Sequence, residues 1–125
     1  MRWDEWRFSA ALAWRDTFVR WGNVVSCIFL LITSLYLLWR LIPEGARMGT
    51  LALHYTMYLG IDDVRAWPWV FALPALMLIL LTMNAAVAAG VYRGDALAAR
   101  TMTAVSCALT ILWSIGSFFL VRINL

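Results

Sequence analysis

The sequence predicts an all-α integral membrane protein, with three transmembrane helices and an interfacial amphipathic helix at the amino end. Of its 125 residues, 64% are hydrophobic, against roughly 45–50% in an ordinary soluble domain. Only 14% are charged, and their clustering leaves three uncharged runs, at residues 21–39, 66–92 and 101–121. As helices rising about 1.5 Å per residue, all three can cross a hydrocarbon core of about 30 Å. This composition excludes a soluble globular domain.

Residues 1–20 are predicted to form the interfacial helix. At 100° per residue, the tryptophans of this segment (Trp3, Trp6 and Trp14) gather on one face together with the adjoining Trp21, and polar residues (Arg2, Glu5, Ser9, Asp16 and Arg20) gather on the other. Tryptophan favours the headgroup region because its ring is apolar while its indole N–H needs a partner. We expect the tryptophan face to contact the lipid surface, with a protein partner as the alternative.

Residues 21–125 are predicted to form one transmembrane domain with spans at 21–42, 67–92 and 101–122. The first span should end before Pro43, because proline lacks the N–H that would continue the helix. In the second span, Pro68 suits the first turn, and Pro74 offers a place for a bend that the long run needs. Cys27 and Cys107 lie in apolar runs and are expected to be free thiols.

Two helix faces are predicted to be packing surfaces. The second span carries Asn84 and small residues spaced for close backbone approach, whereas the third span carries a stripe of hydroxyls. We expect partner contacts at Asn84, Ala85, Ala89, Gly90, Ser106, Thr110, Ser114 and Ser117, together with Trp3, Trp6 and Trp14. A seam between two helices of the same chain is the simpler interpretation of the hydroxyl stripe.

The arginines predict the orientation in the membrane. All ten basic residues are arginines; three crossings put six of them on the side of the amino end and four on the other. Because cytoplasmic segments carry the excess of basic residues, we expect the amino terminus in the cytoplasm and the carboxyl terminus outside. A net charge of +3 with no basic run argues against nucleic-acid binding.

The outer connection, residues 43–66, has the most specific sequence. Alternating apolar residues from Leu51 to Met57 predict a short extended piece, and the following segment, 60–63, reads as a turn. Either Asp62 or Asp63 would then cap the second span. The connection also holds His54, the only histidine of the chain.

A motif in this connection carries a family resemblance. His54, Tyr55, Tyr58, Gly60 and Asp62, followed by Trp67, resemble the loop signature of small bacterial three-helix membrane proteins, which is distantly similar to a domain of SdpI-like immunity proteins. The resemblance covers residues 41–125 and implies the bacterial inner membrane. This sequence departs from the signature at Thr56, where asparagine is usual, and at Arg65-Ala66, where Gly-Pro is usual.

Three roles for His54 stay open on the sequence. It orients the loop through a hydrogen bond, or it is a single axial ligand to bacteriochlorophyll or haem, or the loop senses an external ligand through its acids. No paired carboxylates with a nucleophile, phosphate loop or metal cluster occur in the sequence, so catalysis is not indicated. The sequence therefore favours a non-catalytic subunit that contacts the lipid bilayer and other integral membrane proteins. A cofactor-binding subunit and an SdpI-like sensor or immunity protein are the alternatives.

Overall fold

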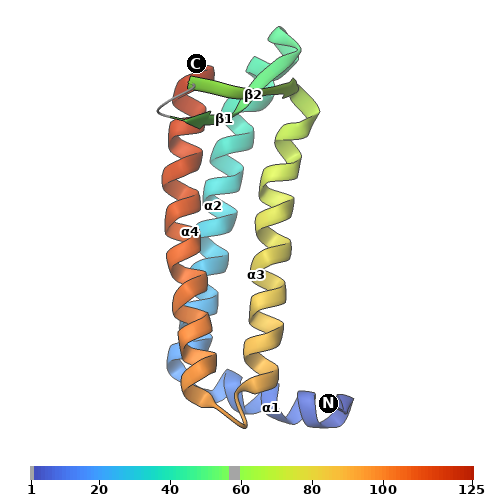
Figure 1. Ribbon diagram of the computed structural model, residues 1–125, viewed down its shortest axis with the longest axis vertical. Helices are drawn as coiled ribbons and strands as arrows, with labels where there is room; N and C mark the ends of the chain where they lie inside the picture. The colour runs from blue at the N-terminus through green and yellow to red at the C-terminus, as the bar shows by residue number, and fades with distance from the viewer. Residues whose placement is uncertain (1, 57–59) are drawn as a thin grey trace.

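The computed structural model of the chain describes residues 2–56 and 60–125. Its elements, labelled in Figure 1, are α1 (Trp3–Arg15), α2 (Thr17–Met48), β1 (Thr50–Thr56), β2 (Gly60–Ala66), the 3-10 turn η1 (Trp67–Phe71), α3 (Ala72–Val91) and α4 (Ala96–Asn124). The fold is therefore mainly helical, with one two-stranded antiparallel sheet added.

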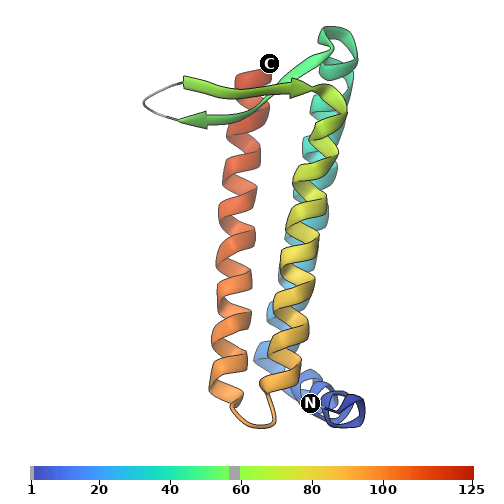
Figure 2. The same ribbon diagram turned by 45° about the vertical axis from the view of Figure 1, so that its right-hand side comes forward.

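The three long helices form a bundle with a crosswise element at each end. Figure 1 shows α2, α3 and α4 running alongside one another, with α1 lying across the end where α2 begins. Figure 2 shows the hairpin of β1 and β2 lying across the opposite end and extending past α4. Helix α4 packs closely on both α2 and α3, whereas α2 and α3 contact each other much less.

Within the described residues, three helices are long and apolar enough to cross a membrane. The candidate spans are Thr17–Met48, Trp67–Val91 and Ala96–Asn124, each of which contains an 18-residue stretch with a mean hydropathy of 2.0, 2.2 and 2.0, respectively. Most of the side chains in their apolar stretches face outward rather than into the bundle. A helical bundle that is apolar on its outer surface suits hydrocarbon as its surrounding solvent.

Helix α2 is longer than the sequence predicted at both ends. It begins at Thr17 rather than Trp21, because the Asp16 side chain caps it, and α1 accordingly ends at Arg15 rather than residue 20. It also continues through Pro43, where we expected it to stop, and ends at Gly49 with a left-handed φ of 79°. The Gly49 N–H reaches the Gly45 carbonyl oxygen at 2.7 Å, which closes the last turn.

The last turn of α2 is held by packing against the hairpin end. Gly45 is buried so closely against Trp67 and Leu51 that a Cβ at this position would lie 2.5 Å from the Trp67 Cβ. Glu44 and Arg47, one turn apart on the same helix, form an ion pair. Such tertiary packing outweighs the local cost of Pro43, which removes only one backbone hydrogen bond near the helix end.

The predicted turn at residues 60–63 is wrong, because this segment forms the first part of β2. Thr50 pairs with Ala66 and Thr56 with Gly60 in the antiparallel register. The extended piece predicted from Leu51 to Met57 is confirmed for residues 51–56 of β1, whereas Met57 lies outside the described residues. Neither Asp62 nor Asp63 is an N-cap, since the next helical turn is η1, preceded by Ala66.

The second span begins at Trp67, as predicted, whereas the third begins earlier than predicted. Pro68 lies in the first turn of η1, as expected, but the backbone changes from 3-10 to α geometry at Ala72, before Pro74. Helix α4 begins at Ala96, one turn before Thr101, because the Asp95 side chain accepts a hydrogen bond from the Ala98 N–H at 2.9 Å. The connection between the second and third spans is thus shorter than the expected 93–100.

The interior changes character along the bundle. Near the hairpin, large apolar side chains form the core, centred on Leu37, Leu41, Leu51, Val70 and Val121. Toward α1, the core consists of small and polar groups. Thr103 packs directly against Gly22 and leaves no room for a Cβ there, and the Ser26 hydroxyl donates to the Cys107 sulfur at 3.3 Å. Small residues allow the backbones of α2 and α4 to approach closely at this end.

Candidate functional site

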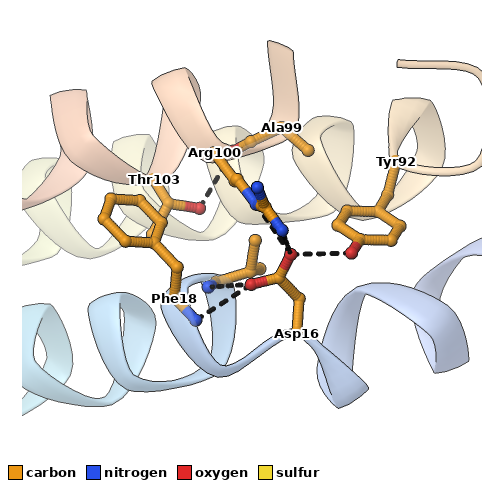
Figure 3. Close-up of polar contacts among 7 residues, drawn as sticks. Asp16, Phe18, Tyr92, Ala99, Arg100 and Thr103 are labelled. Carbon is orange, nitrogen blue, oxygen red and sulfur yellow. Dashed lines mark hydrogen bonds and ion pairs between the residues drawn. The ribbon is translucent and has the colours of Figure 1, made fainter. Parts of the chain in front are cut away.

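A carboxylate links the four helices at the α1 end of the bundle (Figure 3). One Asp16 oxygen accepts hydrogen bonds from the backbone N–H groups of Phe18 at 2.9 Å and Val19 at 3.3 Å. The other accepts from the Tyr92 hydroxyl at 2.7 Å and from the Arg100 guanidinium, whose Nε and Nη2 both lie 2.8 Å away. Asp16 thus joins the start of α2 to the end of α3 and the start of α4. We call Asp16, Tyr92 and Arg100 the carboxylate clasp.

The clasp favours the charged form of Asp16. Only 4% of its side chain is exposed. The hydrogen bond from Tyr92, the Arg100 guanidinium and the two backbone N–H groups lower the pKa of Asp16 to about 2, against the opposing effect of burial. The same contact raises the pKa of the Tyr92 hydroxyl. Asp16 is therefore ionised throughout the physiological pH range and does not exchange a proton there.

Helix α1 is bound to the end of α3 through Ser9 of its polar face and through Trp6 of its tryptophan face. The Ser9 hydroxyl, predicted among the polar residues opposite the tryptophans, is buried and donates to the Ala89 carbonyl oxygen at 2.6 Å. It also accepts from the Arg93 N–H at 3.0 Å. Carbonyls at a helix C-terminus lack intrahelical partners, so Ser9 satisfies groups that α3 leaves open.

The three tryptophans of α1 have different surroundings. The Trp6 indole N–H donates to the Ala86 carbonyl oxygen at 3.0 Å, and its ring stacks on Trp3 with a centroid distance of 5.3 Å. Trp3 and Trp14 remain 68% and 57% exposed. The Trp6 indole is thus hydrogen-bonded within the chain, whereas Trp3 and Trp14 leave apolar surface exposed.

A groove separates α2 from α3 near the α1 end. It has a volume of about 360 Å³ and its apolar lining includes Leu30, Leu78 and Leu81. The small residues of α3 that line it are Ala85, Ala86 and Ala89, while Trp6 borders it from α1. Four of the predicted partner-contact residues therefore line this groove: Trp6, Ala85, Ala89 and Ser106.

Apart from Ala85 and Ala89, the predicted contact residues of the spans pack inside the chain. Asn84 donates to the Met102 carbonyl oxygen at 2.8 Å and to the Ser106 hydroxyl at 2.5 Å, so the predicted hydrogen bond across this face is made with α4. Ser106, Thr110 and Ser117 are buried, Gly90 is buried beside Ser9, and Ser114 pairs with Thr33 of α2 at 2.8 Å. The hydroxyl stripe thus faces helices of the same chain, because α4 is the helix that the other two share.

The hairpin is fixed to the bundle by Asn124. Its side-chain amide accepts from the Ala52 N–H at 2.8 Å and donates to the Ala52 carbonyl oxygen at 2.7 Å. This pair of bonds reproduces on β1 the pattern of a neighbouring strand. The motif side chains of His54, Tyr55 and Asp62, together with Tyr58 and Gly60, lie outside the described side chains, whereas Trp67 packs against the core near Gly45.

The described residues offer no group of three or more His, Cys, Asp or Glu side chains that could hold a metal ion. Both cysteines, which the structure describes, are free thiols. Comparison of the chain with protein-family models, curated proteins and solved structures finds no match. No relative therefore indicates a role for the carboxylate clasp.

Sequence reasoning missed the carboxylate clasp. One local signal was present, since aspartate is a favoured N-cap and Asp16 lies a few residues before the uncharged run that begins at residue 21. Nothing local connects Asp16 to Tyr92 and Arg100, which lie 76 and 84 positions away.

Proposed function

We propose that the protein is a non-catalytic subunit of a larger assembly in the bacterial inner membrane, and that a transmembrane helix of a partner protein occupies the groove between α2 and α3. The observation that carries this proposal is the open groove itself, whose α3 side is made of Ala85, Ala86 and Ala89. Small residues allow a second helix backbone to approach closely, which is how helices associate in lipid.

The distribution of polar groups supports a packing role. Three polar residues of the bundle, Asn84, Ser106 and Thr110, make hydrogen bonds within it. The groove between α2 and α3 is lined mainly by apolar side chains. Such a surface suits association better than catalysis.

Substitutions in the groove test the proposal. Tagged wild-type protein, Ala86→Leu and Ala108→Leu would be purified from native membranes in mild detergent, and copurifying proteins identified by mass spectrometry. Ala86 lines the groove and Ala108 is an exposed alanine of α4, so both variants add the same side chain to exposed helix surface. We expect wild type and Ala108→Leu to retain the same integral membrane partner and Ala86→Leu to lose it. A monomer without a partner, or equal retention by both variants, would contradict the proposal.

We further propose that the α1 end faces the cytoplasm and the hairpin faces outside. Six arginines lie toward the α1 end (Arg2, Arg7, Arg15, Arg20, Arg93 and Arg100), and four toward the hairpin end (Arg40, Arg47, Arg65 and Arg122). This asymmetry agrees with the rule that cytoplasmic segments are richer in basic residues.

Thiol labelling tests the orientation. In a protein without its native cysteines, a membrane-impermeant reagent applied to intact cells should label Val64→Cys in the hairpin and spare Gly94→Cys between α3 and α4. Both positions are exposed. The reverse labelling pattern would refute the orientation and leave the groove proposal untouched.

A further inference from the structure

A second cavity lies beside the carboxylate clasp, and its lining combines charge with apolar surface. It has a volume of about 590 Å³ and is formed by Leu12, Arg15, Asp16, Thr17, Phe18, Tyr92 and Arg100. These residues come from α1, the α1–α2 junction, the end of α3 and the first turns of α4. The cavity is therefore at the boundary where the three candidate spans begin or end.

The carboxylate in this cavity has no capacity left for a ligand. An ionised carboxylate offers about four lone-pair positions. The Asp16 oxygens already accept from Phe18, Val19, Tyr92 and Arg100. A cation such as the ammonium of a zwitterionic headgroup would have to displace one of these bonds, so the cavity does not favour it.

The remaining polar groups of the cavity are mainly donors. Arg100 directs its Nε and Nη2 at one Asp16 oxygen, which fixes the guanidinium, while its side chain stays 52% exposed. A guanidinium carries five N–H donors, so donors remain after the contacts with Asp16. Arg15 is exposed and forms no ion pair within the described part of the chain. Two guanidinium groups against one carboxylate leave a surplus of one positive charge. Guanidinium groups match the geometry of phosphate oxygens.

The apolar part of the lining indicates the source of the phosphate. Phe18 is 52% exposed in the first turn of α2, and Leu12 is half-buried on α1. The phosphate of a membrane lipid lies at the end of a span while its acyl chains extend along the helices, so arginines and apolar side chains meet the same molecule. Free phosphate would use the arginines and leave Phe18 and Leu12 without a role.

We propose that this cavity is a binding site for an anionic glycerophospholipid, with Arg15 and Arg100 on the phosphodiester and with Phe18 and Leu12 against the acyl chains. Arg100 is a preorganised donor because Asp16 holds it, whereas Arg15 supplies the second charge. The carboxylate clasp has two effects in this site: it joins the helices, and it withdraws the only acid of the cavity from contact with the ligand.

Lipid titration with a matched variant tests the site. Wild type, Arg15→Gln and Arg7→Gln would be purified in a neutral detergent and titrated with phosphatidylglycerol or phosphatidylcholine, and bound lipid counted by native mass spectrometry. Arg7 is also an exposed arginine of α1 but does not line the cavity, so both variants lose the same charge from the same helix. We expect one phosphatidylglycerol to bind wild type, about tenfold weaker binding by Arg15→Gln, and binding by Arg7→Gln within about twofold of wild type.

Each other outcome overturns the proposal. Equal losses in Arg15→Gln and Arg7→Gln would show only general attraction between anionic lipid and a basic helix. Equal binding of phosphatidylcholine and phosphatidylglycerol would show that the site does not select anionic lipid. Selection is expected because the Asp16 carboxylate has no acceptor position left for a cationic headgroup. Displacement of the lipid by inorganic phosphate at comparable concentration would assign the site to free phosphate instead. Circular dichroism spectra of both variants establish that they fold, which is expected because both side chains are exposed.

Discussion

Replacing Asp16 by alanine should destabilise the protein by about 3 kcal/mol. The substitution removes the N-cap of α2, at a typical cost of about 1 kcal/mol. It also removes the acceptor of the Tyr92 hydroxyl, a hydrogen bond to a charged group that contributes about 1.5 kcal/mol. The ion pair with Arg100 adds less than about 1 kcal/mol, because half of the arginine side chain is exposed to solvent.

Two further variants separate these contributions. Asp16→Asn retains a capping oxygen and loses the charge, so we expect a cost of about 1–2 kcal/mol. Arg100→Gln leaves the cap and the Tyr92 hydrogen bond in place and should cost less than about 1 kcal/mol. The expected order of destabilisation is therefore Asp16→Ala, then Asp16→Asn, then Arg100→Gln.

Unfolding in a mild detergent, followed by circular dichroism during titration with a denaturing detergent, measures these differences in unfolding free energy. An Arg100→Gln variant as unstable as Asp16→Ala would refute the assignment of most of the energy to the cap and Tyr92. A loss below about 0.5 kcal/mol in Asp16→Ala would show that the clasp contributes little, since surface substitutions commonly reach that size.

The lowered pKa of Asp16 predicts that the unfolding free energy depends on pH. The pKa of Asp16 lies at about 2 in the folded protein, below the ordinary value of 3.8 for an aspartate. A carboxyl with a lowered folded-state pKa contributes stability that is present above its unfolded pKa and lost as the pH falls through the folded value. The stability advantage of wild type over Asp16→Asn should thus be constant near neutral pH and disappear between about pH 4 and pH 2.

Three more predictions concern the helix seams and the hairpin. Gly22→Ala should cost about 1–3 kcal/mol in detergent unfolding, because its Cβ would overlap a methyl of α4, whereas Gly116→Ala, whose Cβ meets nothing within 4 Å, should be neutral or stabilising. Asn84→Leu should destabilise the bundle by about 1 kcal/mol through loss of its two hydrogen bonds to α4; an unchanged unfolding midpoint would contradict this. Asn124→Leu should speed hydrogen exchange at the Ala52 amide about tenfold, and exchange at the wild-type rate would show that Asn124 does not anchor the hairpin.

The sequence was most informative where one local property decides the structure. Apolar length alone predicted three candidate spans, and the alternation from Leu51 predicted β1. Asn84 was correctly expected to bond across a helix contact, because a buried amide needs partners. In each case the decisive information lies within one element.

Contacts between distant residues decided the rest. Local rules end α2 at Pro43, but the burial of Gly45 against Trp67 extends it by another turn. The segment 60–63 contains glycine and two acids typical of a turn, yet its pairing with β1 makes it a strand. The burial of Ser9 was also missed, because amphipathicity identifies an apolar face without showing that a serine of the polar face binds the end of α3.

The attachment of the hairpin through Asn124 sets an order of events during biosynthesis. Ala52 leaves the ribosome long before its partner, which is 72 positions further along the chain. Until α4 has been made and inserted, the outer edge of β1 lacks this neighbour, and a two-stranded hairpin alone is only marginally stable. The hairpin is thus fully bonded only after α4 has taken its place beside α2.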